Sequence, residues 1–281
     1  MTKFFIYGLY LISSDYEKQK RNYDQQKDFI SEMKAAAQNF VSSTDKSEIE
    51  TILLSGSVAR GDYFPRQDEK GGYVGMIDLI VMKKKGSSAT AEKIFGPNQE
   101  PAIPYHCIKS GDLWFAIWFT DFISADDFVH FEEARKFSIL EAEILYDKNK
   151  LYEAELKKIN QIKTEECEKK LSDNTGYIHY LLSDYKKDRW ERRAALLQLN
   201  ENLNTAIRIG VCALYYKNNS YVPAEDRQLY YSLTLENLPE NYESVITELK
   251  NQNVTSLEDY KRREDLFRST LLDFIMTAFH R

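Results

Sequence analysis

The chain has 281 residues, of which 43% are hydrophobic and 29% are charged. This composition excludes a disordered chain and is sufficient for a sizeable buried core. The formal net charge is −6: positions 1–150 hold 19 basic and 23 acidic residues and positions 151–281 hold 19 and 21, so neither half has the positive excess of an extended nucleic-acid-binding surface.

The cysteines and the first apolar run indicate in which cellular compartment the protein is expected. Cys107, Cys167 and Cys212 are far apart and odd in number, which indicates neither a disulfide framework nor a cysteine-based zinc site. The apolar run at residues 4–12 is too short to cross a bilayer, and no cleavage site of small residues follows it. We therefore expect a cytoplasmic protein without a membrane partner, and the sequence leaves a homodimer open.

Residues 1–150 are predicted to combine strands, helices and loops. Residues 14–42 contain no Gly or Pro, and apolar side chains at spacings of three and four mark one helix face. Ser124 predicts a capped helix that begins at Ala125. Apolar runs predict strands, and Gly- and Pro-containing stretches predict loops. The strands are expected at residues 51–54, 77–82, 113–120 and 144–146, and the loops at 61–75 and 86–105.

The second half of the chain changes to helical periodicity. Apolar residues recur every three or four positions from Leu196 to Leu214, and Pro223 blocks continuation of that helix. A similar stripe near the end consists of Leu266, Thr270, Phe274 and Ala278. We therefore predict an α+β protein: a domain of residues 1–150 with flanking helices on a mixed sheet of about four or five strands, then an all-helical domain of residues 151–281.

One stretch carries candidate chemistry. Gly56 and Ser57 follow the first predicted strand; a glycine lets the backbone approach a phosphate closely, and the N–H groups of the turn suit an anion. The Ser57 hydroxyl can add a hydrogen-bond donor, and the Arg60 guanidinium can bind a phosphate with two parallel hydrogen bonds. Asp78, on the next strand, can reach the same pocket and hold a divalent cation.

The phrase Gly-Ser-Val-Ala-Arg-Gly-Asp at 56–62, followed by Ile-Asp-Leu-Ile-Val at 77–81, resembles the nucleotidyltransferase superfamily typified by DNA polymerase beta and the kanamycin nucleotidyltransferases. That signature is a strand, Gly-Ser, a spacer, and Asp-hydrophobic-Asp on the next strand; a helical second domain follows in that group. The resemblance implies transfer of a nucleoside monophosphate from a nucleoside triphosphate (NTP) to a hydroxyl of a small-molecule acceptor, with Mg²⁺. Gly56, Ser57 and Arg60 would bind the nucleotide, and Asp78 would be the catalytic metal ligand.

The sequence departs from this pattern at the acids. If Asp78 is the second acid of the pair, Met76 occupies the place of the first; if Asp78 is the first, Ile80 occupies the place of the second. Two-metal phosphoryl transfer needs carboxylates that hold two cations about 3.5–4 Å apart. A third acid is expected on the following strand, where Asp112 stands at the start and Ala116 and Trp118 stand at the centre.

Other carboxylates offer replacements. Asp62 and Asp112 are candidate metal ligands beside Asp78, although both also suit solvated turns, and Asp68 or Glu69 in the spacer could fold back. Three interpretations follow: an active transferase, a degenerate relative that acts as a nucleotide-binding, regulatory or interaction module, and a structural protein with a vestigial first half. The Gly-Ser turn favours the first two, and Met76 favours the second over the first.

Overall fold

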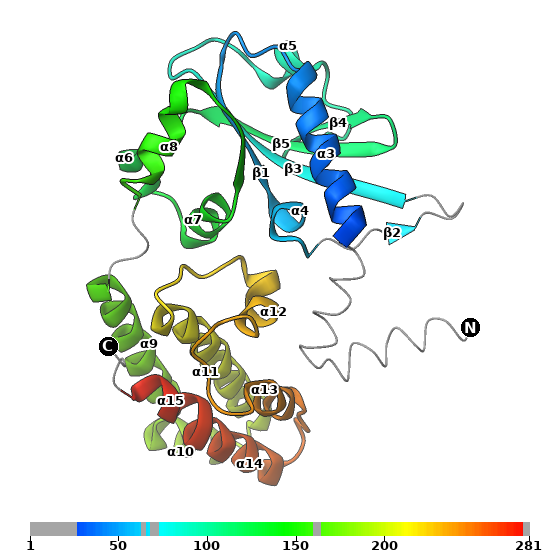
Figure 1. The fold of residues 1–281 in the computed structure, drawn as a ribbon. Coiled ribbons are helices and arrows are strands. Elements are labelled where there is room, and N and C mark those ends of the chain that lie inside the picture. Colours follow the sequence, from blue (N-terminus) through cyan, green and yellow to red (C-terminus); the bar gives the residue numbers. More distant parts are fainter. Residues whose placement is uncertain (1–26, 63–65, 68–72, 160–163, 278–281) are drawn as a thin grey trace. The chain divides into compact units, whose positions relative to one another are not determined.

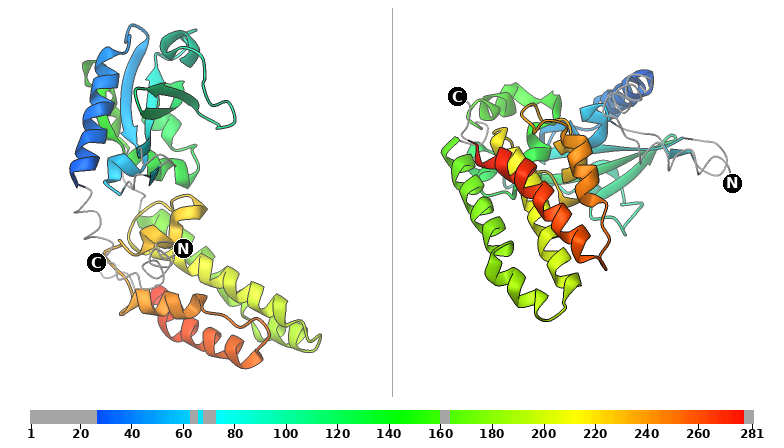
Figure 2. Two further views of the ribbon diagram at one scale, coloured as in Figure 1. Left: turned by 90° about the vertical axis from the view of Figure 1, so that its right-hand side faces the viewer. Right: turned by 90° about the horizontal axis from the view of Figure 1, so that it is seen from below.

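The computed structural model describes residues 27–62, 66–67, 73–159 and 164–277 (Figures 1 and 2). The chain divides into two compact units, Met1–Asn160 and Gln161–Arg281. The apolar run at 4–12 and the first part of the helix predicted at 14–42 lie outside the described residues, as do Asp68, Glu69 and Ala278.

A mixed sheet forms the centre of the first unit. Its strands are β1 (Ile49–Ser55), β2 (Arg66–Gln67), β3 (Tyr73–Lys83), β4 (His106–Ser110), β5 (Leu113–Asp121) and β6 (Glu143–Asp147). In space they run in the order β4-β5-β3-β1-β6, with β2 beside β3 (Figure 1). β3 and β5 are parallel, whereas β1 pairs antiparallel with both β3 and β6, and β4 pairs antiparallel with β5.

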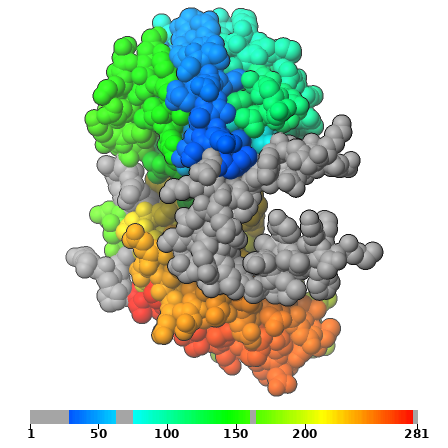
Figure 3. Space-filling view, turned by 45° about the vertical axis from the view of Figure 1, so that its right-hand side comes forward, coloured from blue at the N-terminus to red at the C-terminus, as the bar shows by residue number. Residues whose placement is uncertain are grey.

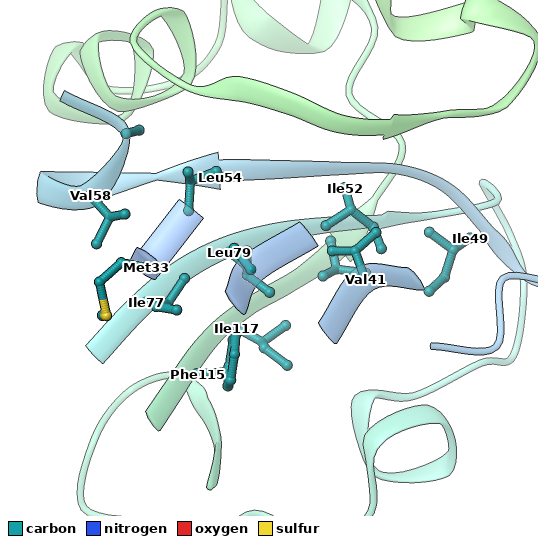
Figure 4. Close-up of a cluster of buried hydrophobic side chains, with 13 residues drawn as sticks. Met33, Val41, Ile49, Ile52, Leu54, Val58, Ile77, Leu79, Phe115 and Ile117 are labelled. Carbon is teal, nitrogen blue, oxygen red and sulfur yellow. The ribbon is translucent and has the colours of Figure 1, made fainter. Parts of the chain in front are cut away.

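Helix α3 (Lys27–Ser43) covers one face of the sheet. Its apolar residues recur every three or four positions, so they form one stripe, and Met33 and Val41 pack with Ile77 and Leu79 of β3 in one buried cluster (Figure 4). Burial of each such side chain contributes about 1.5–3 kcal/mol. The opposite side of α3 runs along the surface of the unit (Figure 3). The helix therefore fixes β3 and β1, the two strands on which the candidate residues lie.

The other face of the sheet is covered by packed side chains at one end, and its side chains are only half-buried at the other end. Met76 and Asp78 lie on this face and are half-buried. Farther along it, Phe131 packs edge-on against Trp118 with ring centroids 6.1 Å apart, and the Arg135 guanidinium lies 4.0 Å from the Trp118 ring. Thr51, Leu53, Ile80 and Met82 on this face are fully covered.

Short helices complete the described part of the first unit. They are α4 (Gly56–Arg60), α5 (Ala91–Phe95), α6 (Ala125–Phe128), α7 (Glu133–Leu140) and α8 (Leu151–Leu156), with a 3-10 turn at Lys148–Lys150. The unit extends past residue 150 because β6 is tied directly to α8. Asp147, at the end of β6, accepts hydrogen bonds from the backbone N–H groups of Tyr152 at 3.0 Å and Glu153 at 2.8 Å.

The start of α6 supports a pH-dependent prediction. Ser124 and Asp127 form a capping box, in which the Ser124 hydroxyl donates to the Asp127 carboxylate at 2.6 Å. These bonds to Ser124, helped by Lys85, lower the pKa of Asp127 to about 2 from 3.8. Because the pKa is lower in the folded chain, this stabilisation is present above pH 3.8 and is lost as the pH falls towards about 2.

We expect Ser124→Ala to lower the free energy of unfolding by about 1 kcal/mol at neutral pH. The difference from the natural protein should narrow as the pH falls below 3.8, where Asp127 takes up a proton. Urea unfolding at several pH values measures both effects. Ser138→Ala is the control, because the Ser138 hydroxyl donates to the Ala134 carbonyl inside α7 and not to a carboxylate. A constant difference between Ser124→Ala and the natural protein at every pH would contradict the prediction.

The described residues of the second unit form helices joined by loops. Its elements are α9 (Thr164–Leu181), α10 (Asp184–Glu191), α11 (Leu196–Lys217), α12 (Gln228–Ser232), α13 (Tyr242–Lys250), α14 (Leu257–Phe267) and α15 (Asp273–Met276), with a 3-10 turn at Glu225–Arg227 and a π segment at Arg268–Leu272. The predicted stripe of α11 is its buried face. At Gly210 on this stripe, an added Cβ would lie 3.0 Å from the Phe267 ring, so the missing side chain lets α14 pack closely.

The α+β class is confirmed, and no strand occurs among the described residues beyond position 160. Two loop predictions are wrong in part. β3 begins at Tyr73, inside the loop expected at 61–75, and α5, capped by Thr90, interrupts the loop expected at 86–105. β4 was not predicted, because this edge strand contains few apolar residues. In the described part of the chain, no helix is both long and apolar enough to cross a membrane.

Candidate functional site

The turn between β1 and α4 brings Gly56 against Asp78. Ser55 and Asp78 are register partners in the antiparallel β1–β3 pair, so Gly56 begins the turn beside Asp78. Gly56 has φ +70, and a Cβ added there would lie 2.1 Å from Oδ2 of Asp78. Only glycine allows the carboxylate to approach this backbone without strain. The structure therefore places Asp78 beside Gly56, the residue that precedes Ser57.

One row of residues crosses four strands at this level. Ser55 of β1 is beside Asp78 of β3, which is beside Ala116 of β5, which is beside Cys107 of β4. Cys107 is buried, and burial together with the negative charges of Glu100 and Asp78 raises the pKa of its thiol. A thiol held in its neutral form is a weak metal ligand and nucleophile. The row therefore supplies one carboxylate, that of Asp78.

The neighbouring positions on this face are not acidic. Met76 precedes Asp78 by two residues on the same face of β3, and its partner on β5 is Trp114. Ala116 and Trp118 continue this face along β5. Among the described residues, no group of three or more His, Cys, Asp or Glu side chains is arranged to hold a metal ion. The described part of the site therefore does not fit two Mg²⁺ ions, because Met76 and Trp114 offer no hard oxygen ligand.

Arg60 lies at the end of α4 and is engaged by acidic side chains. Its Nη1 donates to Oε2 of Glu141 at 2.9 Å, and its Nε donates to Oδ2 of Asp62 at 3.4 Å. Lys34 of α3 donates to the Ala59 carbonyl at 3.4 Å, which also fixes the end of α4. A phosphate bound by Arg60 would have to compete with these carboxylates. Sequence reasoning missed Glu141, because no local spacing links two residues 81 positions apart.

Asp62 is not the solvated turn residue that its position suggested. Its side chain is 11% exposed, and its buried Oδ1 has no hydrogen-bond partner within the described part of the chain. The reason lies in Gly61, which has φ +78 and reverses the chain, so that the Asp62 N–H donates to the Ser57 carbonyl at 3.0 Å. Asp62 is thus bound to α4 and to Arg60.

Asp112 lies away from Asp78. It is exposed in the turn before β5, whereas the β5 partner of Asp78 is Ala116. Four residues of extended chain separate these levels, a distance of about 13 Å. Asp68 and Glu69 fall outside the described residues. Of the sequence-predicted site residues, the structure therefore brings together Gly56, Ser57 and Asp78, and it does not bring Asp112 to them.

No known family model matches the sequence, and no curated protein matches it. Among solved structures, the chain is similar to a nucleotidyltransferase-like protein from Exiguobacterium sibiricum 255-15. The two are 9% identical, and the similarity covers 87% of this chain and 74% of that chain with a TM-score of 0.39. A likeness at this level carries no argument about activity, so the functional argument rests on the residues of the site.

Proposed function

We propose that the first unit is a nucleotidyltransferase-like module that binds an NTP at the Gly56-Ser57 turn and whose transfer reaction is impaired. The observation that carries this proposal is the contact of Asp78 with Gly56 on a sheet face where Met76 is the neighbouring side chain. The reaction of an intact module would move a nucleoside monophosphate to a hydroxyl of a small-molecule acceptor. The sequence signature supports that reaction class and does not identify the acceptor.

Binding would use groups at the start of α4. The backbone N–H groups of the turn and the Ser57 hydroxyl can donate to phosphate oxygens. The missing side chain of Gly56 leaves room for the Asp78 carboxylate, which is thereby held beside the turn. An NTP can bring one Mg²⁺ with it, and Asp78 is the described carboxylate that could add a ligand to that ion. Arg60 would add positive charge after exchanging Glu141 for phosphate.

Transfer would be weak for an electrostatic reason. The ion that activates the acceptor hydroxyl depends on protein carboxylates, and the side chains beside Asp78 on this face are those of Met76 and Trp114. Loss of one such electrostatic element commonly lowers kcat about 10²–10³-fold. We therefore expect NTP binding to be retained and transfer to be slow or absent.

The test compares the natural chain with Ser57→Ala, Met76→Asp and Met76→Asn. Calorimetry with each NTP and Mg²⁺ measures binding, and a panel of hydroxyl acceptors measures transfer. Ser57→Ala should weaken NTP binding about tenfold, because a hydrogen bond to a charged phosphate is lost. Met76→Asp should strengthen Mg²⁺-dependent binding and raise transfer, whereas the neutral isostere Met76→Asn should do neither.

Two results would contradict the proposal. The natural chain could transfer nucleotides at ordinary enzyme rates, on the order of 1–10³ per second, and lose this activity on Met76→Asp. Alternatively, no NTP could bind with or without Mg²⁺. The side chains beside Asp78 favour one second candidate, a regulatory or interaction module with this fold, and retained NTP binding with no transfer in either Met76 variant would support it.

A further inference from the structure

Three exposed tyrosines gather where α9 ends and α10 begins. Tyr177 and Tyr180 of α9 are 50% and 53% exposed, and Tyr185 of α10 is 66% exposed. The rings of Tyr177 and Tyr180 are nearly parallel, at 17°, with centroids 6.0 Å apart. Tyr177 and Tyr180 are not among the buried residues of α9, and α10 has no buried residue, so these rings are not part of a helix-packing core. Large rings left this exposed are available to a partner.

Cationic side chains accompany these rings. The Lys186 ammonium lies 4.3 Å from the centre of the Tyr180 ring, and the Arg189 guanidinium lies 5.0 Å from that of Tyr185. Arg189 also donates to the Tyr185 hydroxyl at 2.8 Å. A hydrogen bond from Lys186, together with the charges of Lys186 and Arg189, lowers the pKa of Tyr180, which places both cations near that ring. We name Tyr177, Tyr180, Tyr185, Lys186 and Arg189 the tyrosine–arginine surface.

We propose that the tyrosine–arginine surface binds a short stretch of single-stranded nucleic acid. The nearly parallel rings of Tyr177 and Tyr180, together with the ring of Tyr185, present exposed flat aromatic surface of the kind on which unstacked bases pack. Lys186 and Arg189 are placed to pair with the phosphates between those bases. A duplex does not offer its base faces, so the surface favours single strands.

The small area of positive charge limits the length of nucleic acid that this surface can bind. Residues 184–193 contain five basic and three acidic residues; Asp188 is paired with Arg192 at 2.7 Å, and Lys187 is paired with Glu264 of α14 at 2.9 Å, which leaves four basic residues against three acidic ones. The local excess is therefore positive, although residues 151–281 as a whole carry 19 basic and 21 acidic residues. A polyanion would be attracted over this small area and repelled beyond it. The surface fits a few nucleotides, in keeping with the absence of an extended basic face in the sequence.

The experiment measures fluorescence anisotropy of end-labelled oligothymidylate and oligouridylate with the full chain, at low and at physiological salt. The natural protein should bind these single strands more tightly than a duplex of equal length. Tyr177→Ala with Tyr180→Ala should weaken binding about tenfold, since stacking of a base on an aromatic ring is lost. Arg189→Gln should weaken binding and lower the slope of log affinity against log salt by about one.

The matched control is Tyr177→Phe with Tyr180→Phe, which keeps both rings and should keep binding. Tyr105→Ala, which alters a 43% exposed tyrosine of the first unit, should also leave binding unchanged. The proposal is overturned if no single strand binds, or if the Ala variants bind as the natural chain does. It is also overturned if polyglutamate, which has no bases, competes equally, or if the surface instead pairs two copies of the chain, seen as a dimer in sedimentation that the Ala variants dissociate.

Discussion

Gly56→Ala is expected to lower the free energy of unfolding of the first unit by about 2–4 kcal/mol, the combined effect of backbone strain and overpacking. An L-residue at φ +70 is strained, and the new Cβ would lie 2.1 Å from Oδ2 of Asp78. Asp78 or the turn must move, so NTP binding at the turn should be lost as well. Urea unfolding followed by tryptophan fluorescence, in a Trp190→Phe background, confines the signal to Trp114 and Trp118 of this unit.

Gly61→Ala is the matched control for Gly56→Ala. Gly61 also has a left-handed conformation, with φ +78, but an added Cβ there meets no described residue within 4 Å. Its cost should be limited to backbone strain, about 1–2 kcal/mol. Equal losses at the two glycines would show that the contact with Asp78 has no energetic consequence.

Asp78→Ala provides a second check on Gly56→Ala. Removing the carboxylate takes away the two atoms nearest to the added methyl, at 2.1 and 2.9 Å, and leaves the Asp78 Cβ at 3.1 Å. The cost of Gly56→Ala should then fall towards that of Gly61→Ala, and the double-mutant cycle measures the difference as a coupling between the two residues.

The second large effect is expected at Arg263, whose side chain is completely buried between α11, α13 and α14. Its guanidinium donates to the Leu249 carbonyl at 2.9 Å, to Oδ1 of Asn200 at 2.9 Å and to Oδ1 of Asn204 at 2.6 Å. Arg263→Met would leave these acceptors without their donor and should cost about 3–5 kcal/mol. Hydrogen exchange of α11 peptides measures the loss within the second unit.

Arg262→Met is the neighbouring control. Arg262 is 40% exposed and pairs on the surface with Asp259 at 2.9 Å and with Glu248. Exposed ion pairs contribute little, so this variant should change the free energy of unfolding by no more than about 1 kcal/mol. If both arginine variants destabilised the second unit equally, the buried hydrogen bonds of Arg263 would not be the cause.

The parts of the fold that could be predicted are those marked by a pattern of neighbouring residues in the sequence. The strand before Gly56, the apolar β3 and the stripe of α11 can each be recognised within about a dozen residues. Ser124 likewise predicts the start of α6 from its own position and that of Asp127. For the same reason, Gly56 and Asp78 could be proposed as neighbours, since one follows the first predicted strand, the other lies near the start of the second, and strands consecutive in the sequence commonly pair.

The remaining features depend on strand order, which the sequence pattern does not contain. Glu141 reaches Arg60 only because β6 lies beside β1, and Cys107 enters the row of Asp78 only because β4 lies beside β5. The burial of Asp62 follows from the conformation of Gly61 after a five-residue helix. The sequence offers no acid at the other metal-ligand positions, and in the structure Met76, Trp114 and Ala116 stand beside Asp78 on the same face.

The position of β6 has a consequence for synthesis of the chain. β1 is an inner strand, paired with β3 on one side and with β6 on the other, and Thr51 is the register partner of Asp147. A ribosome makes β1 and β3 early, and β1 then keeps one side of unsatisfied N–H and C=O groups until β6 has emerged. An unpaired strand of this kind readily joins strands of other nascent chains. The nascent first unit is therefore exposed to wrong strand pairing until its last strand has emerged.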